Sequence, residues 1–217
     1  MTGASAVLLR KIVRCHVTNA RIEFAGIDSN FDEDECDTAA TDKFDALFET
    51  QSTCPACFDS TVVGEQIREI LDQFNGLIYC AGDADLASGD AGFIPPDADS
   101  LRCAARVSNL LGGLAVRAIR CHRQRVSTQL NSASFDEPGC KAIGMDNFNA
   151  GSAQLEAAGI CPPCLEAGAR TQLAGQLLSI MDGNNALTYC ANCADDTQCA
   201  APQTCGGGGI GNICGGP

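Results

Sequence analysis

The chain has 217 residues and a formal net charge of −13, and it contains 15 cysteines but no tryptophan. The acidic balance argues against nucleic acid and anionic membrane surfaces as partners, because binding to both depends on Lys and Arg. Aromatic residues make up only 5% of the chain, so small folded units must rely on aliphatic side chains and cystine to hold them together.

A series of short motifs occurs twice in the same order, from Cys-His through Phe-Asp-Glu and Cys-Pro-x-Cys to Tyr-Cys. The first copy consists of Cys15-His16, Phe31-Asp32-Glu33, Cys36, Phe44, Cys54-Pro55-Ala56-Cys57 and Tyr79-Cys80. The second consists of Cys121-His122, Phe135-Asp136-Glu137, Cys140, Phe148, Cys161-Pro162-Pro163-Cys164 and Tyr189-Cys190. Such a repeat predicts a tandem architecture. We expect a first helical repeat at 1–80, an acidic linker at 81–100, a second helical repeat at 101–190 and a cystine-rich tail at 191–217.

The first unit predicts three helices. The first, over 4–28, carries an apolar stripe at helical spacing: Leu9, Ile12, Val13, Val17, Ala20 and Phe24. An acidic turn at 31–36 precedes the second helix, over about 37–49, and carboxylates there suit a helix N-terminus. The third helix is expected to begin at Cys54-Pro55, since Pro is tolerated in a first helical turn, and to end at the Asn75-Gly76 stop signal.

The second unit predicts the same three helices. Its first helix starts near Ser100, Gly112-Gly113 would allow a bend in it, and the other two cover about 141–157 and 162–182. No stretch shows sustained alternation of apolar and polar residues, so we predict an all-α fold. The tail is too rich in Gly and Cys to have a core and predicts a small two-disulfide knot.

The density of cysteines predicts a disulfide framework in an oxidising compartment, outside the cytoplasm. A metal–thiolate protein is the alternative, but zinc modules place their ligands on short turns, whereas these cysteines lie far apart. All of them are disulfide candidates: Cys15, Cys36, Cys54, Cys57, Cys80, Cys103, Cys121, Cys140, Cys161, Cys164, Cys190, Cys193, Cys199, Cys205 and Cys214. No apolar run is long enough to span a bilayer, so no membrane span is expected.

Helix geometry narrows the pairings. A helix over 37–49 would separate Cys36 from Cys54 by about 20 Å, which is too far for a cystine. An up-down-up bundle places the start of the second helix beside the end of the third. The expected pairs are therefore Cys36–Cys80 and Cys140–Cys190, with Cys15 bonded to Cys54 or Cys57, Cys121 to Cys161 or Cys164, and Cys103 to the cysteine of that motif left over.

This pairing leaves one cysteine in the first unit without a partner. The position that matches Cys103, eighteen residues before Cys15, would fall before Met1. We therefore expect the chain to be a fragment, or a wrongly assigned start, of a longer secreted protein. The same hypothesis explains why no signal peptide is recognisable at the N-terminus.

Cys-Pro-x-Cys is a redox motif when it opens a helix after a strand, because the helix N-terminus lowers the thiol pKa. No strand precedes either copy, and both copies are in register with other cysteines, which favours structural bonds. Hydrolase and phosphate-binding motifs are absent. We therefore do not expect an enzyme, and a thiol–disulfide oxidoreductase is an alternative.

His16 and His122 each follow a cysteine and interrupt an apolar stripe. We expect each to be a buried imidazole, hydrogen-bonded to a backbone carbonyl or to the acidic turn, with no resident cofactor. The alternative is a ligand for a metal ion or haem iron in an electron-transfer component, although no Cys-x-x-Cys-His is present for covalent haem attachment. The carboxylates of Asp32-Glu33 and Asp136-Glu137 are expected to cap helices or to lie in solvated turns.

The motif series, with Lys43-Phe44-Asp45-Ala46 between its cysteines, resembles cysteine-rich helical repeat proteins exported by some Gram-negative bacteria. The resemblance covers about residues 4–190, and the second unit departs from it with Asn147-Phe148-Asn149-Ala150. It implies export and no particular reaction. We expect a secreted structural or binding scaffold in a cell-surface or extracellular assembly, whose repeats offer matching faces to a protein partner or to self-assembly.

Overall fold

The computed structural model describes residues 2–49, 59–80, 95–131, 133–183, 204–208 and 211–215. These residues form α1 (Thr2–Ala25), α2 (Glu33–Glu49), α3 (Ser60–Ile78), α4 (Ala98–Leu130), α5 (Glu137–Ala158), the 3-10 turn η2 (Pro163–Leu165), α6 (Ala167–Gly183), β1 (Thr204–Gly208) and β2 (Gly211–Gly215). The two short strands pair antiparallel, with Cys205 opposite Cys214 in the backbone register. The body of the protein is all-α, as predicted, and none of the described helices has the length and apolar character needed to cross a bilayer.

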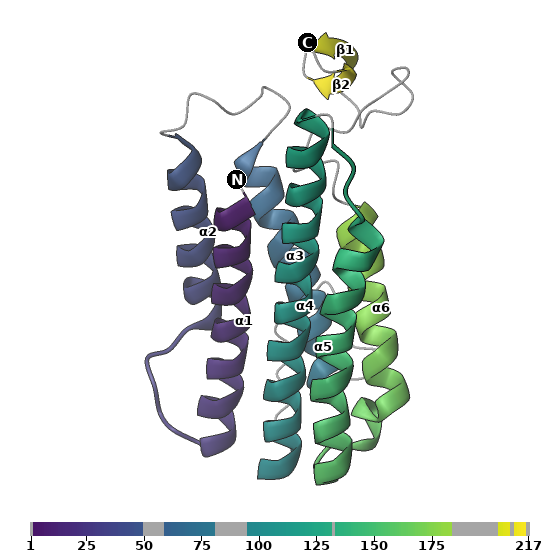
Figure 1. Cartoon of the computed structure of the whole chain (residues 1–217). Helices are drawn as coiled ribbons and strands as arrows, with labels where there is room; N and C mark the ends of the chain where they lie inside the picture. Colours follow the sequence, from purple (N-terminus) through teal and green to yellow (C-terminus); the bar gives the residue numbers. More distant parts are fainter. Residues whose placement is uncertain are drawn as a thin grey trace.

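The helices run side by side in one bundle (Figure 1). The helices α1, α2 and α3 contact one another, and so do α4, α5 and α6. The two sets meet along α1 and α4, with a further contact between α3 and α4. Figure 1 shows α4 between α1 on one side and α5 on the other, so α4 forms the centre of the bundle.

One hydrophobic cluster draws side chains from all six helices. Members that are at most 2% exposed come from both sets of helices: Leu8, Leu9, Ile12, Phe44, Val107, Phe148 and Leu177. Burial of one such side chain stabilises the fold by about 1.5–3 kcal/mol. Most of the predicted linker at 81–100 lies outside the described residues, and α4 already begins at Ala98.

Glycines allow α4 to approach its neighbours closely. The helix is continuous through Gly112-Gly113, and a Cβ at Gly112 would lie 3.4 Å from Cγ2 of Val13 on α1. On α5, a Cβ at Gly151 would overlap the side chain of Leu110 on α4. Glycine lowers the helix propensity of α5, but Gly151 is also a point at which α5 contacts α4.

The second helix of each set begins before its predicted start. The start of α2 is Glu33, and the preceding Asp32 accepts a hydrogen bond from the backbone N–H of Glu35 (3.0 Å). At the start of α5, Asp136 accepts one from the backbone N–H of Gly139 (2.9 Å). These caps satisfy N–H groups that the first turn of a helix leaves free, so most of the predicted acidic turn is helical.

The third helices also differ from the prediction. The Asn75-Gly76 stop signal is wrong, because α3 continues to Ile78, which is 3% exposed and gains from burial of its last turn. The predicted start at Cys54-Pro55 lies outside the described residues, and α3 is capped by Asp59. The segment predicted as one helix over 162–182 is divided between η2 and α6.

Four disulfides join described cysteines. They are Cys15–Cys36 between α1 and α2, Cys121–Cys140 between α4 and α5, Cys103–Cys161 between α4 and the segment before η2, and Cys80–Cys164 between the end of α3 and η2. Cys103 therefore bonds to the second Cys-Pro-x-Cys, in agreement with the sequence analysis. Cys54, Cys57, Cys190, Cys193 and Cys199 lie outside the described residues, as does most of the tail predicted as a knot.

The other predicted pairings are wrong: Cys36–Cys80, Cys140–Cys190, and the bonds of Cys15 and Cys121 to a Cys-Pro-x-Cys. The cause is the loop at 26–32, which runs back alongside α1 before α2 begins (Figure 1). Cys36 is therefore level with Cys15 in the body of α1, and their Cα atoms are 6.0 Å apart. The Cα atoms of Cys121 and Cys140 are 5.8 Å apart.

The Cys80–Cys164 bond also changes how the cysteines are counted. It joins the first motif series to the second, so the cysteines cannot be counted within each unit separately. The expectation that the chain is a fragment used that separate count, and it stays a prediction.

Arg170 fixes η2 against α5, and its side chain is fully buried. Its guanidinium donates hydrogen bonds to the Ser152 hydroxyl (2.7 Å), the Ser152 carbonyl (3.1 Å), the Leu165 carbonyl (2.5 Å) and the Glu156 carboxylate (2.9 Å). The turn that contains the second Cys-Pro-x-Cys is thus held by the interior of the bundle.

Candidate functional site

The first histidine cluster consists of His16 on α1, Glu33 and Asp37 on α2, and Asp72 on α3. The Nε2 atom of His16 lies 3.0 Å from Asp72 Oδ1, 3.2 Å from Asp37 Oδ2 and 3.6 Å from Glu33 Oε1. His16 is only 3% exposed. Three carboxylates from two helices therefore surround one buried ring nitrogen.

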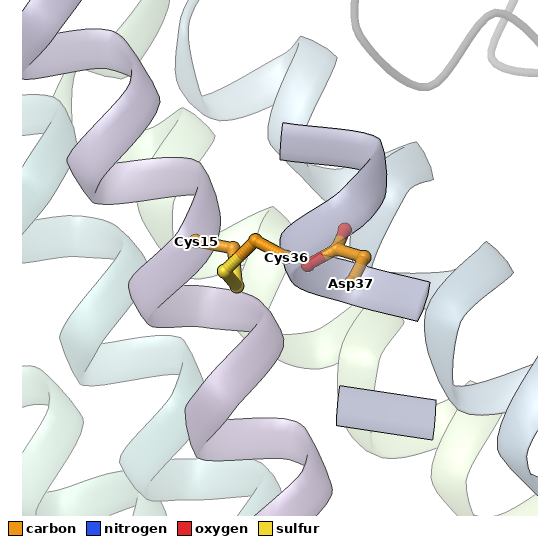
Figure 2. Close-up of side chains that lie close together, drawn as sticks. All are labelled: Cys15, Cys36 and Asp37. Atoms are coloured by element: carbon orange, nitrogen blue, oxygen red, sulfur yellow. A yellow bond between two sulfur atoms is a disulfide. The ribbon is translucent and has the colours of Figure 1, made fainter. Parts of the chain in front are cut away.

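Helix periodicity and a disulfide bring these groups together. Glu33 and Asp37 are four residues apart, so they lie on the same face of α2. The Cys15–Cys36 disulfide joins α1 to α2, and Figure 2 shows it beside Asp37. Because Cys15 precedes His16 and Cys36 precedes Asp37, the bond fixes α2 against α1 at the cluster itself.

The carboxylates favour the charged form of His16. Burial lowers the pKa of this imidazole, but hydrogen bonds to Asp37 and Asp72, together with the attraction of Asp37 and Glu33, outweigh burial and raise the pKa to about 9. For Asp37, burial raises the pKa of the carboxyl group, and the hydrogen bond to His16 opposes that effect. The charges of the cluster therefore depend on one another.

Asp37 is under-satisfied in its buried position. Its side chain is 6% exposed, and its Oδ1 atom has no hydrogen-bond partner among the described residues. An unsatisfied buried polar atom costs about 1–3 kcal/mol, and more when it is charged. One more positively charged or hydrogen-donating group beside Asp37 would therefore stabilise the cluster.

The second histidine cluster consists of His122 on α4, Glu137 and Lys141 on α5, and Asp182 on α6. The Nε2 atom of His122 lies 2.9 Å from Asp182 Oδ1 and 3.3 Å from Glu137 Oε1. The Lys141 ammonium lies 2.5 Å from each of the same two oxygens. Arg125 binds the other oxygen of Glu137 at 3.1 Å, so both carboxylates have cationic partners.

The two clusters share their geometry but not their charge. At the place of Lys141 the first cluster has Asp37, because each follows its glutamate by four residues. At the place of Arg125 it has Asn19, which donates a hydrogen bond to Glu33 Oε2 (2.5 Å). A lysine and an arginine are thus replaced by an aspartate and an asparagine, and the first cluster is far more negative.

Part of these clusters is recognisable in the sequence. The sequence predicts that His16 and His122 are buried and hydrogen-bonded to a backbone carbonyl or to the acidic turn. Both are buried, and Glu33 and Glu137, one from each acidic turn, lie near them. The remaining members were missed: Asp37, Asp72, Lys141 and Asp182. The available signal is the spacing of four residues on α2 and α5, whereas no sequence pattern indicates the contribution of the third helices.

The second Cys-Pro-x-Cys does not form the bond that a redox motif would form. Cys161 and Cys164 are bonded to Cys103 and Cys80, and not to each other. Cys15 and Cys36 lie near Asp37, but their sulfurs are bonded to each other and are not thiolate ligands. Among the described residues, the remaining groups whose ligand atoms lie close enough to share one metal ion are His16, Asp37 and Asp72 in the first cluster and His122, Glu137 and Asp182 in the second.

No protein-family model, no curated protein and no solved structure matches the chain. Function is therefore inferred from the geometry of these clusters and from the disulfides.

Proposed function

We propose that this protein is an extracytoplasmic scaffold that binds a protein partner, or further copies of itself, within a cell-surface or extracellular assembly. The observation that supports this role best is the Cys80–Cys164 bond, which links the first set of helices covalently to the second. Together with the continuous core, it restrains the two sets as one body. A component that must present its surfaces at fixed positions needs such rigidity.

The disulfides also support the proposed compartment. Four of them join described cysteines, and structural disulfides persist in secreted and extracellular proteins but are rare where thiols are kept reduced. The acidic surface favours solubility and disfavours anionic partners.

We further propose that the two sets of helices are tandem copies of one three-helix unit. Cys15–Cys36 and Cys121–Cys140 span 21 and 19 residues and join matching helices. In both sets a histidine next to the first cysteine meets carboxylates from the second and third helices. Repeated units present matching faces to partners, which favours a binding role.

Two alternatives receive less support. An oxidoreductase needs a reversible bond within Cys-Pro-x-Cys, whereas Cys161 and Cys164 have separate structural partners. A haem against His16 would need a large pocket, and the cavity that borders this residue is about 10 Å³, which is the space of about one water molecule.

The scaffold proposal is tested by mapping the cysteines in the protein as its host makes it. Cells are treated with an alkylating agent before lysis, and the purified chain is digested without reduction. We expect peptides that contain the Cys80–Cys164 and Cys103–Cys161 bonds, and chemical cross-linking on intact cells should give a defined larger species. Alkylated Cys161 and Cys164, or insulin reduction that is lost in Cys161→Ser, would instead support the oxidoreductase.

A further inference from the structure

We propose that the first histidine cluster binds one divalent cation of the zinc class, and that the ammonium of Lys141 takes the place of this cation in the second cluster. The ligands are His16, Asp37 and Asp72, whose ligand atoms all lie within 4.8 Å of one another, and Glu33 lies beside them, 3.6 Å from the same ring nitrogen. This inference goes beyond the scaffold role and does not depend on it, because a bound ion could be present in a protein of any function.

The atoms of the cluster are already close to the arrangement that a small cation needs. The three carboxylate oxygens lie 3.0, 3.2 and 3.6 Å from His16 Nε2. Ligands at about 2.0–2.2 Å from a tetrahedral zinc ion lie roughly 3.3–3.6 Å from one another. The ligand atoms of His16, Asp37 and Asp72 also lie within 4.8 Å of one another, so adjustments of these side chains would bring them around one ion.

The types of ligand select the class of ion. Calcium and magnesium are bound through oxygen atoms alone, so an imidazole at the centre of the cluster argues against them. Imidazole with carboxylate is a common ligand set for zinc and for the other late first-row divalent ions. The cysteines nearby are bonded to each other, so a site with thiolate ligands does not arise.

The hydrogen bonds of His16 indicate that a cation would satisfy the carboxylates better than a single proton does. Asp37 and Asp72 both approach the same ring nitrogen, and that nitrogen carries at most one proton. One proton cannot serve both carboxylates well, and Asp37 Oδ1 has no partner among the described residues, although the side chain is buried. A metal ion on Nε2 would bind both carboxylates at once.

The second cluster supplies an internal comparison. There the Lys141 ammonium lies 2.5 Å from both Glu137 Oε1 and Asp182 Oδ1. The same two oxygens approach His122 Nε2, so a positive charge lies among the imidazole and its carboxylates. In the first cluster the residue at this place is Asp37, which can bind a cation but cannot supply one.

The experiment uses the untagged, oxidised full chain after treatment with EDTA. Zinc is titrated in against a chromophoric chelator, bound zinc is counted by mass spectrometry of the metal, and calcium is the comparison ion. We expect one zinc per chain, a higher Tm with zinc and no binding of calcium. Asp37→Lys should weaken zinc binding by roughly 100-fold or more, whereas Asp42→Lys, at an exposed position of the same helix, should bind zinc as the natural chain does.

A second variant keeps the proposal testable even where Asp37→Lys does not fold. Lys141→Asp combined with Arg125→Asn gives the second cluster the polar residues of the first, and the zinc content should rise from one ion to two. The proposal is overturned when the natural chain binds no zinc, when Asp37→Lys folds and binds zinc unchanged, or when the double variant folds and still binds only one ion. Binding of zinc that is unaffected by both changes would be adventitious.

Discussion

Replacement of Cys80 and Cys164 by alanine should lower the free energy of unfolding by about 3–4 kcal/mol. The two cysteines are 84 residues apart, and closure of such a loop in the unfolded chain corresponds to about 4.6 kcal/mol. The Cys103–Cys161 bond shortens the loop, because the path from Cys80 can cross that bond and continue to Cys164. The shortened path has about 26 residues, for which the same relation gives about 3.5 kcal/mol.

The two bonds should therefore not act additively. In a chain that already lacks Cys103–Cys161, the Cys121–Cys140 bond still shortens the loop to about 65 residues, so loss of Cys80–Cys164 should cost about 4.3 kcal/mol, which is about 0.8 kcal/mol more than in the natural chain. Urea unfolding followed by circular dichroism, for the natural chain, both double variants and the fourfold variant, measures this difference. Strictly additive losses, or no loss for the first pair, would refute the account of nested loops.

Three further results are expected from similar unfolding measurements. With EDTA present, the free energy of unfolding should fall by on the order of 3 kcal/mol as the pH rises from 6.5 through about 9. The reason is that the raised pKa of His16 stabilises the fold fully only at a pH below the ordinary pKa of histidine. His16→Gln should remove this dependence on pH, and an unchanged dependence would contradict the assignment to His16. Gly151→Val should destabilise the protein by about 1–3 kcal/mol, because the new side chain would overlap Leu110. Gly175→Ala, at an exposed helix position with free space around it, should instead stabilise it by about 0.5–1 kcal/mol. Equal effects of the two substitutions would mean that α4 and α5 are not in close contact. Arg170→Ala should cost about 2–4 kcal/mol, since it leaves a cavity and removes the buried hydrogen bonds to the carbonyls of Leu165 and Ser152. A loss below about 1 kcal/mol would show that η2 does not depend on this side chain.

Local patterns were sufficient for the helices but not for their relative offset. The spacing of Leu9, Ile12 and Val13 predicts α1, and carboxylates near Cys36 correctly indicate a helix N-terminus. The disulfides depend on how far α2 is displaced along α1, and that displacement is set by the path of the loop at 26–32 and by side-chain packing. The order of residues in the sequence does not indicate the path of the loop or the packing. The predicted pairs therefore rest on helices whose ends lie level, and Cys36 is paired with the wrong partner.

The candidate site was predictable to a similar extent. His16 and His122 are conspicuous because they interrupt apolar stripes, and a buried imidazole needs a polar partner. The acidic run after α1 has two roles in adjacent residues, since Asp32 caps α2 while Glu33 faces the histidine. Asp72 is 56 residues from His16 in the chain, and only the docking of α3 shows that the two side chains meet.

This geometry gives a physical reason for the adjacent cysteine and histidine in both motif series. Adjacent residues on a helix point about 100° apart, so Cys15 can bond to α2 while His16 faces the carboxylates of α2 and α3. Carboxylates that crowd together in the interior repel one another, and the helices would separate to let water reach them. The disulfide opposes that separation at the residue next to the cluster, and Cys121 stands in the same relation to His122. Each disulfide therefore holds a charged group where packing alone would not keep it, and the positive charge needed to stabilise that group comes from lysine in one cluster and, we propose, from a bound cation in the other.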